Sequence, residues 1–202
     1  MIDIVPTLLP PANPQYPPPD IVLHIGLAAG RDYFAIEQGS SKTGYGEIPD
    51  VDGELFADTL SSAKFDEDMF PATLTTSFDT SDVLARWKSH LGFALPDGDA
   101  TLEKRPDVRA SANVGNFMCG FIYYNSLAHY FSIKQDERPV VFLHVPDLSG
   151  NEDKLREGKK VTVALIKALV ESLRKVGLVD VGRQADDDLG TANGAQTDNN
   201  FA

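Results

Sequence analysis

The residue best suited to covalent chemistry in this 202-residue chain is its single cysteine, Cys119. It lies in the stretch SANVGNFMCGFIYYNSLAHYF, residues 111–131, after a glycine-containing turn and at the start of an apolar run of helical length. Cysteine is often a small core residue. The amides at a helix N-terminus, however, stabilise a thiolate, so this position also suits a thiol nucleophile. The sequence leaves both interpretations open.

A thiol nucleophile needs a base within reach, and the chain has four histidines. His144 is the best candidate, because it ends the apolar stretch VVFLHV and sites in α/β sheets form at the carboxyl ends of strands. His24 lies inside an apolar strand, where a hydrogen-bonded core histidine is the simpler interpretation. His90 is expected on the surface, and His129 lies about three turns along the helix from Cys119.

The acid that would orient such a base is Glu37, at the end of the short apolar run DYFAIE. A charged strand end is more often a solvated edge, so this assignment also stays open. The loop GLAAGR, residues 26–31, fits neither a dinucleotide fingerprint nor a P-loop, and a tight turn is the simpler interpretation. No His/Cys pair has metal-ligand spacing, so we expect no metal site.

Alternating strands and helices must position these residues. Strands are expected over residues 20–27, 33–38, 107–111 and 139–146, and helices over residues 80–91, 117–133 and 158–176. The first strand is a continuous apolar run and is expected to be buried on both faces, and residues 39–80 are expected to form a long surface excursion. The alternation predicts an α/β fold, a three-layer α/β/α sandwich around a mostly parallel twisted sheet.

The chain divides into three expected parts. Residues 1–19 form a proline-rich leader, residues 20–180 a single α/β domain, and residues 181–202 a polar tail that lacks hydrophobic periodicity and is expected to be disordered.

The charge balance is acidic, with a formal net charge of −12 at pH 7. This argues against nucleic acid and anionic membranes as partners, because both need a basic surface. A single cysteine cannot form an internal disulfide, no stretch approaches the length of a membrane span, and the N-terminus does not read as a signal peptide. We therefore expect a cytoplasmic protein.

Three segments together resemble the pyroglutamyl peptidase I (pyrrolidone-carboxylate peptidase) family of cysteine peptidases, in its eukaryotic form. PDIVLHIGLAAGRDYFAIE resembles the family's strand, glycine-rich turn and glutamate motif, SANVGNFMCGFIYYNSL its cysteine motif, and VVFLHVPDL its histidine motif. The three motifs occur in the family's order, and the resemblance covers about residues 18–177.

The resemblance implies a cysteine peptidase (omega peptidase) that hydrolyses an N-terminal pyroglutamyl residue from peptides, without metal or cofactor. It implies that Cys119 is the nucleophile, His144 the base and Glu37 the acid that orients the base. The positions that match the family's substrate pocket are Phe117, Met118 and Ile48.

The chain also departs from the family pattern. It has Gly120 where the family usually has asparagine, and Glu47 where the family usually has arginine. Nothing in it matches the family's opening strand and TGFxPFG-like loop, so we expect it to be N-terminally truncated relative to the family. The alternative function is therefore a catalytically impaired or dead member that acts as a binding or interaction protein. A thiol hydrolase outside the family is a third interpretation, and it leaves the glutamate motif unexplained.

Overall fold

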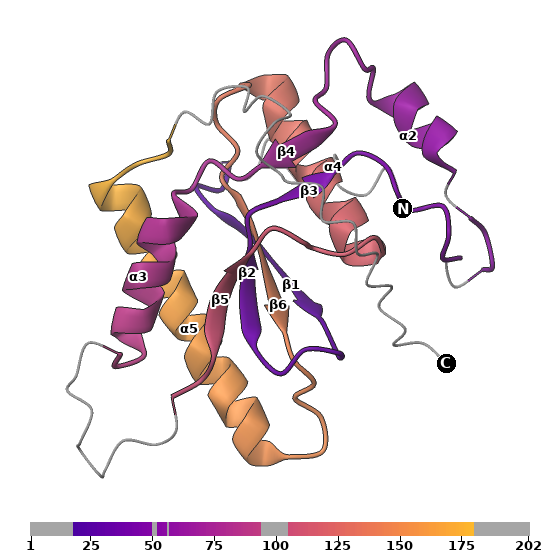
Figure 1. Cartoon of the computed structure of the whole chain (residues 1–202). Helices are drawn as coiled ribbons and strands as arrows, with labels where there is room; N and C mark the ends of the chain where they lie inside the picture. The colour runs from indigo at the N-terminus through magenta and orange to yellow at the C-terminus, as the bar shows by residue number, and fades with distance from the viewer. Residues whose placement is uncertain (1–17, 50–51, 56, 94–104, 180–202) are drawn as a thin grey trace.

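A four-stranded sheet forms the centre of the computed structural model, which describes residues 18–49, 52–55, 57–93 and 105–179 (Figure 1). Across the sheet the strands are β1 (Val22–Leu27), β6 (Val140–Val145), β2 (Phe34–Glu37) and β5 (Val108–Ser111). β1 pairs with β6 and β2 with β5 in parallel, whereas β2 and β6 are antiparallel. The predicted single-domain α/β fold with a mostly parallel sheet is confirmed. The predicted tail, and all but the last two residues of the predicted leader, lie outside the described residues.

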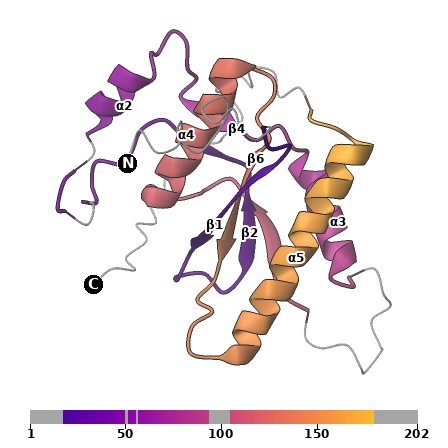
Figure 2. The same ribbon diagram turned by 180° about the vertical axis from the view of Figure 1, so that it is seen from behind.

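Helices cover both faces of this sheet, as the three-layer prediction requires. α3 (Thr80–His90) and α5 (Glu152–Lys175) lie side by side on one face, and α4 (Met118–Ile133) lies on the other (Figures 1 and 2). Trp87 of α3 is fully buried, and its indole nitrogen donates a hydrogen bond of 2.9 Å to the carbonyl of Val161 in α5. This bond satisfies the one polar atom of the largest side chain in that layer.

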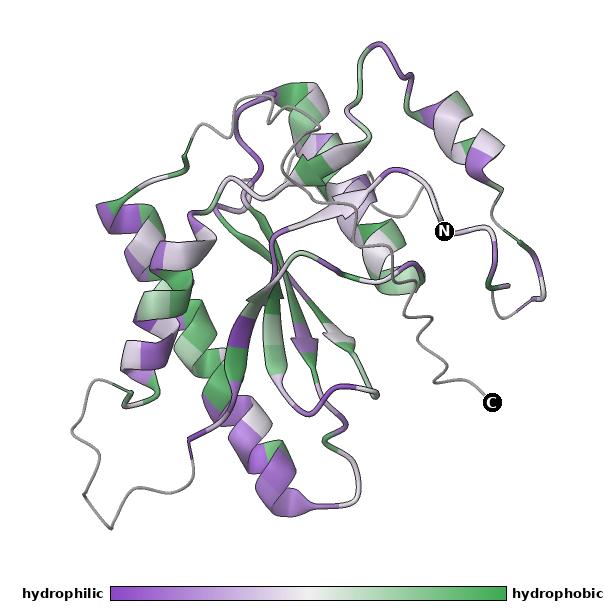
Figure 3. Cartoon of the chain, in the orientation of Figure 1, coloured by the Kyte–Doolittle hydropathy of each residue, from purple (hydrophilic) through white to green (hydrophobic). Residues whose placement is uncertain are grey.

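α5 begins six residues before the predicted start at residue 158. Asn151 caps it, because its side chain accepts a 2.8 Å hydrogen bond from the amide of Asp153. The first two turns are hydrophilic (Figure 3) and carry no apolar periodicity, so the pattern did not reveal them. Gly158 lies inside the helix, where a Cβ would lie 2.4 Å from a methyl carbon of Leu148.

The prediction of a surface excursion over residues 39–80 is wrong in part. β3 (Gly39–Ser41) and β4 (Thr73–Thr75) form a second, antiparallel sheet that contacts α4, and α2 (Asp58–Lys64) lies between them in the chain. Leu74 of β4 is buried. This small sheet therefore adds to the core on the α4 side.

The prediction that β1 is buried on both faces is also wrong. β1 lies at an edge of the central sheet within the described residues, and Ile25 and Leu27 are each 55 % exposed. Ile25 is in register with Leu143, whose side chain belongs to the core under α3 and α5. Continuous apolarity predicted a strand but could not place it within the sheet.

No helix within the described ranges is both long enough and apolar enough to cross a membrane.

Candidate active site

A buried carboxylate and a buried imidazole face each other on the α4 side of the sheet. His144 Nδ1 lies 2.8 Å from Glu37 Oε1, and the two residues are 3 % and 0 % exposed. The register explains the contact. His144 is in register with Ala35, two residues before Glu37 on β2, and alternate residues of a strand share one face. The predicted acid and base are therefore neighbours in space, although 107 positions separate them in the chain.

Arg31 joins this pair from the turn between β1 and β2. Its Nη1 donates a 2.7 Å hydrogen bond to Glu37 Oε1, and its Nη2 donates one of 2.7 Å to the carbonyl of Asn113. Glu37 Oε1 is thus the shared hydrogen-bond partner of the Arg31 guanidinium and the His144 imidazole. A carboxylate oxygen that accepts from both groups pairs with the tautomer of His144 that carries its proton on Nδ1.

The thiol of Cys119 lies against β1, beside the strand that carries His144. A Cβ placed on Gly26 would lie 2.9 Å from Cys119 Sγ, and Gly26 is in register with His144. Cys119 is the second residue of α4 and is half-buried, so the first-turn amides of the helix surround its backbone. The structure therefore brings the predicted nucleophile, base and acid to one face of the sheet.

Aromatic and polar groups fill the space next to this arrangement. The ring centroid of Phe142 lies 4.8 Å from that of His144 and 5.8 Å from that of His24. The Nε2 atom of His24 lies 2.9 Å from the hydroxyl of Ser126. Burial lowers the pKa of His24 below its ordinary value, which keeps this ring neutral. His24 is thus the hydrogen-bonded histidine that its apolar strand predicts.

The other two histidines lie away from the thiol. His90, in α3, contacts Glu171 of α5 at 3.3 Å, with 27 % of its side chain exposed. His129 lies ten residues after Cys119 in α4. Within the described residues, no three side chains among His, Cys, Asp and Glu come together as metal ligands.

The three predicted pocket residues are half-buried. Phe117 is the N-cap residue of α4 and Met118 its first residue, so both directly precede Cys119. Ile48 lies in the loop after β3, three residues beyond Tyr45, whose ring packs edge-on against Phe121 of α4 with 5.6 Å between centroids. Their role in substrate binding stays a prediction.

Gly120 has a structural reason that the sequence did not reveal. A Cβ at this position would lie 2.4 Å from the carbonyl oxygen of Gly115 and 3.0 Å from the ring of Tyr45. Ser40 donates a 2.7 Å hydrogen bond to the Gly120 carbonyl, and its hydroxyl lies 3.0 Å from that of Tyr45. Burial raises the pKa of Tyr45 to about 12, so its hydroxyl stays protonated at neutral pH. The space that a larger side chain would need is thus already filled.

Sequence reasoning missed three residues of this site: Arg31, Ser40 and Tyr45. Arg31 ends the GLAAGR loop, which does form the expected tight turn, with the amide of Arg31 donating to the carbonyl of Ala28 at 2.9 Å. A spacing of six residues does not by itself predict a contact, and the turn between β1 and β2 brings Arg31 back to Glu37. Ser40 and Tyr45 gave no signal either.

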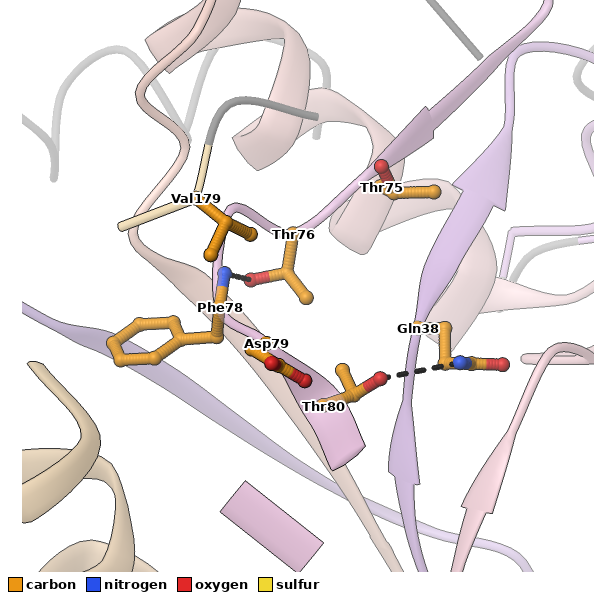
Figure 4. Close-up of a pocket in the computed structure, with 7 residues that line it drawn as sticks. All are labelled: Gln38, Thr75, Thr76, Phe78, Asp79, Thr80 and Val179. Atoms are coloured by element: carbon orange, nitrogen blue, oxygen red, sulfur yellow. Dashed lines mark hydrogen bonds between the residues drawn. The ribbon is translucent and has the colours of Figure 1, made fainter. Parts of the chain in front are cut away.

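A separate hollow of about 200 Å³ lies beside the start of α3 (Figure 4). Gln38, which directly follows Glu37, lines it and donates a 3.1 Å hydrogen bond to the hydroxyl of Thr80. Thr75, Thr76 and Asp79 also line it. Because none of the three candidate catalytic residues lines it, we do not assign the reaction to this hollow.

The fold and the juxtaposition of a thiol, an imidazole and a carboxylate define an α/β protein with a hydrolase-type candidate site. No protein-family model matches the chain. The pyrrolidone-carboxylate peptidase of Pyrococcus furiosus is 27 % identical over 128 residues, which are 63 % of this chain and 52 % of that protein. The chain therefore spans about half the length of this curated relative.

Solved structures of such peptidases share the fold. The pyrrolidone carboxyl peptidase of P. furiosus superposes with a TM-score of 0.53 at 21 % identity, covering 78 % of this chain and 71 % of that one. The enzyme from Thermococcus litoralis gives a TM-score of 0.58 at 19 % identity, covering 81 % and 71 %. The resemblance to the pyrrolidone-carboxylate peptidase family is thus confirmed in sequence and in fold.

Proposed function

We propose that this chain is a cysteine peptidase that removes an N-terminal pyroglutamyl residue from peptides. The observation that carries the proposal is the buried contact between His144 and Glu37, with the thiol of Cys119 against Gly26, in register with His144. Acid, base and nucleophile on one sheet face form the arrangement that thiol hydrolysis requires. The names of the similar proteins supply the substrate class.

In this proposal Cys119 forms the covalent bond, His144 transfers the protons and Glu37 orients His144. Glu37 accepts the Nδ1 proton of His144, which leaves Nε2 as the base. Nε2 takes the thiol proton of Cys119, and the sulfur attacks the carbonyl carbon of the pyroglutamyl group. The tetrahedral intermediate collapses as the peptide amine leaves with the proton from His144. Water, deprotonated by His144, then hydrolyses the thioester and restores the thiol.

The substrate side of the proposal rests on Phe117, Met118 and Ile48. Phe117 and Met118 lie at the start of α4 and Ile48 lies in the loop after β3, and these apolar side chains suit a small, neutral ring that is polar along one edge. We also propose a cytoplasmic location, because the reaction needs a reduced thiol.

A catalytically impaired interaction protein is the second candidate. The exposed apolar side chains of Ile25 and Leu27 on the edge strand favour it, since such edges bind other chains. Glu47, an exposed carboxylate one residue before Ile48, adds a charge that differs from the family pattern.

A fluorogenic pyroglutamyl amide, assayed beside the matching alanyl amide, separates the candidates. Turnover of the pyroglutamyl amide alone, lost in Cys119→Ala, is the expected result. Turnover of both amides would indicate a thiol hydrolase of other specificity, and turnover of neither would favour the interaction protein.

Alkylation by iodoacetamide tests the thiol without any substrate, because Cys119 is the only cysteine. The helix start and a nearby imidazole both favour the thiolate, so half-maximal labelling is expected well below pH 8.5, about the ordinary thiol value. Labelling with a midpoint at or above that value would identify Cys119 as a packing residue.

A further inference from the structure

We propose that Arg31 is a positioning residue of this site. Its guanidinium holds the Glu37 carboxylate in place beside His144 and ties that carboxylate to the loop that leads into Cys119. The inference rests on the proposed function, because it assigns Arg31 a part in the same reaction.

The two hydrogen bonds of Arg31 reach two different segments. One ends on Glu37 at the end of β2, and the other ends on the carbonyl of Asn113, six residues before Cys119, both at 2.7 Å. The same carbonyl also accepts a 3.2 Å hydrogen bond from the hydroxyl of Ser111. A planar guanidinium with fixed donors can hold two acceptors in one geometry, which a lysine cannot do.

The surroundings of Glu37 explain why this bond matters. Its side chain is fully buried, and Oε2 has no hydrogen-bond partner among the described residues. Oε1 therefore makes the hydrogen bonds to both the imidazole of His144 and the guanidinium of Arg31. A buried carboxylate without a cation is strongly unfavourable and tends to turn or take up a proton. Either change would release the Nδ1 atom of His144.

Arg109 on β5 is a matched control for Arg31, because both guanidinium groups lie against the ring of Tyr33. The guanidinium of Arg109 lies 4.0 Å from the ring centroid of Tyr33, and that of Arg31 lies 5.7 Å from the same ring. Arg109 bonds Asp107 at the surface, with 52 % of its side chain exposed, whereas the side chain of Arg31 is 14 % exposed. Removing Arg109 thus removes an arginine from the same aromatic ring without touching Glu37.

The test compares Arg31→Ala, Arg31→Lys, Arg109→Ala, Glu37→Gln and the double variant Arg31→Ala/Glu37→Gln. It measures kcat and KM on a pyroglutamyl amide. It also follows the low-field proton NMR signal of the His144 Nδ1–H group, assigned by its loss in His144→Ala. The NMR signal reports the hydrogen bond to Glu37 and does not depend on turnover.

We expect Arg31→Ala to lower kcat about 100-fold, with KM changed less than about 3-fold, and to lose or shift the Nδ1–H signal. Arg31→Lys keeps the positive charge but loses the planar group that donates to two acceptors at once, so we expect about a 10-fold loss of kcat. Arg109→Ala should match the parent. The double variant should be no slower than Glu37→Gln alone, because Arg31 acts through Glu37.

An unchanged Nδ1–H signal together with parental kcat in Arg31→Ala would overturn the proposal, as would losses that add in the double variant. If Arg31→Ala does not fold, a parental kcat and signal in Arg31→Lys would overturn it. A third outcome separates the two proposals. If the parent protein turns over no pyroglutamyl amide, but its Nδ1–H signal is lost in Arg31→Ala, the proposed function is refuted and the positioning role of Arg31 stands.

Discussion

On the face of the central sheet that α3 and α5 cover, β2 and β6 present Ile36 and Leu143, both fully buried in an apolar core. On the face that α4 covers, the next residues of the same strands are Glu37 and His144, also buried but paired with each other. Successive residues of a strand point to opposite faces. At these positions the two strands therefore supply apolar packing to one side and titratable groups to the other, and Val140 and Phe142 of β6 also pack on the α4 side.

The two faces differ in what their burial contributes. Apolar burial under α3 and α5 stabilises the fold in proportion to the area removed from water. Burial of an ionisable pair contributes little net stability and is strongly unfavourable when one partner is lost. Glu37 and His144 therefore add little to stability, and the α4 face is stabilised instead by its own apolar cluster, which includes Tyr123 and Phe142.

The largest effect expected from this contrast is on turnover. Cys119→Ala and His144→Ala should each lower kcat by about 1,000-fold or more, because members of a triad act as a unit. The melting temperature of Cys119→Ala should stay close to that of the parent, whereas His144→Ala should also melt at a lower temperature, because it leaves the buried Glu37 without one of its two partners. The assay is pyroglutamyl amide turnover with calorimetry beside it. Parental activity in His144→Ala would rule out its assignment as the base.

Substitutions on the sheet face under α3 and α5 should lower the free energy of unfolding rather than kcat. Trp87→Ala removes a fully buried ring and its hydrogen bond to Val161. We expect a loss of about 3–5 kcal/mol in the free energy of unfolding, measured by urea denaturation. At low temperature, where the variant stays folded, kcat should be retained. A collapse of kcat in the folded variant would show that the two faces are not separable.

A smaller effect is expected at the start of α4. Gly120→Ala places a methyl group 2.4 Å from the backbone oxygen of Gly115, which cannot move easily. We expect a loss of about 1–3 kcal/mol in unfolding free energy, together with slower turnover. Gly158→Ala is the matched control on the α5 side, because its 2.4 Å neighbour is a methyl carbon of Leu148, which can rotate away. Equal stability losses in both variants would contradict this account.

The smallest effect on the site concerns the edge of the sheet. If the exposed edge of β1 binds a second copy of this chain, Ile25→Lys combined with Leu27→Lys should reduce that self-association, because charged side chains on an edge strand oppose pairing with another chain. Light scattering against concentration is the measurement, and kcat should change by less than about 2-fold, since both side chains point away from His144. Unchanged self-association would show that this edge is not the contact surface.

The sequence by itself determined the local elements and the residues capable of chemistry. Apolar runs bounded by glycine and proline identified the strands that carry Glu37 and His144, and helical spacing after a turn identified the helix that begins beside Cys119. These signals are local, so they could be read without a fold. Motif order then supported the resemblance that the comparisons confirmed.

Only the tertiary structure decided how these pieces meet. Pairing of β2 with β6 puts Glu37 beside His144, and the turn after β1 carries Arg31 back onto that carboxylate. The edge position of β1 likewise depends on which strands pair. Such contacts join residues far apart in the chain, and their energies depend on burial and register, which no local pattern contains.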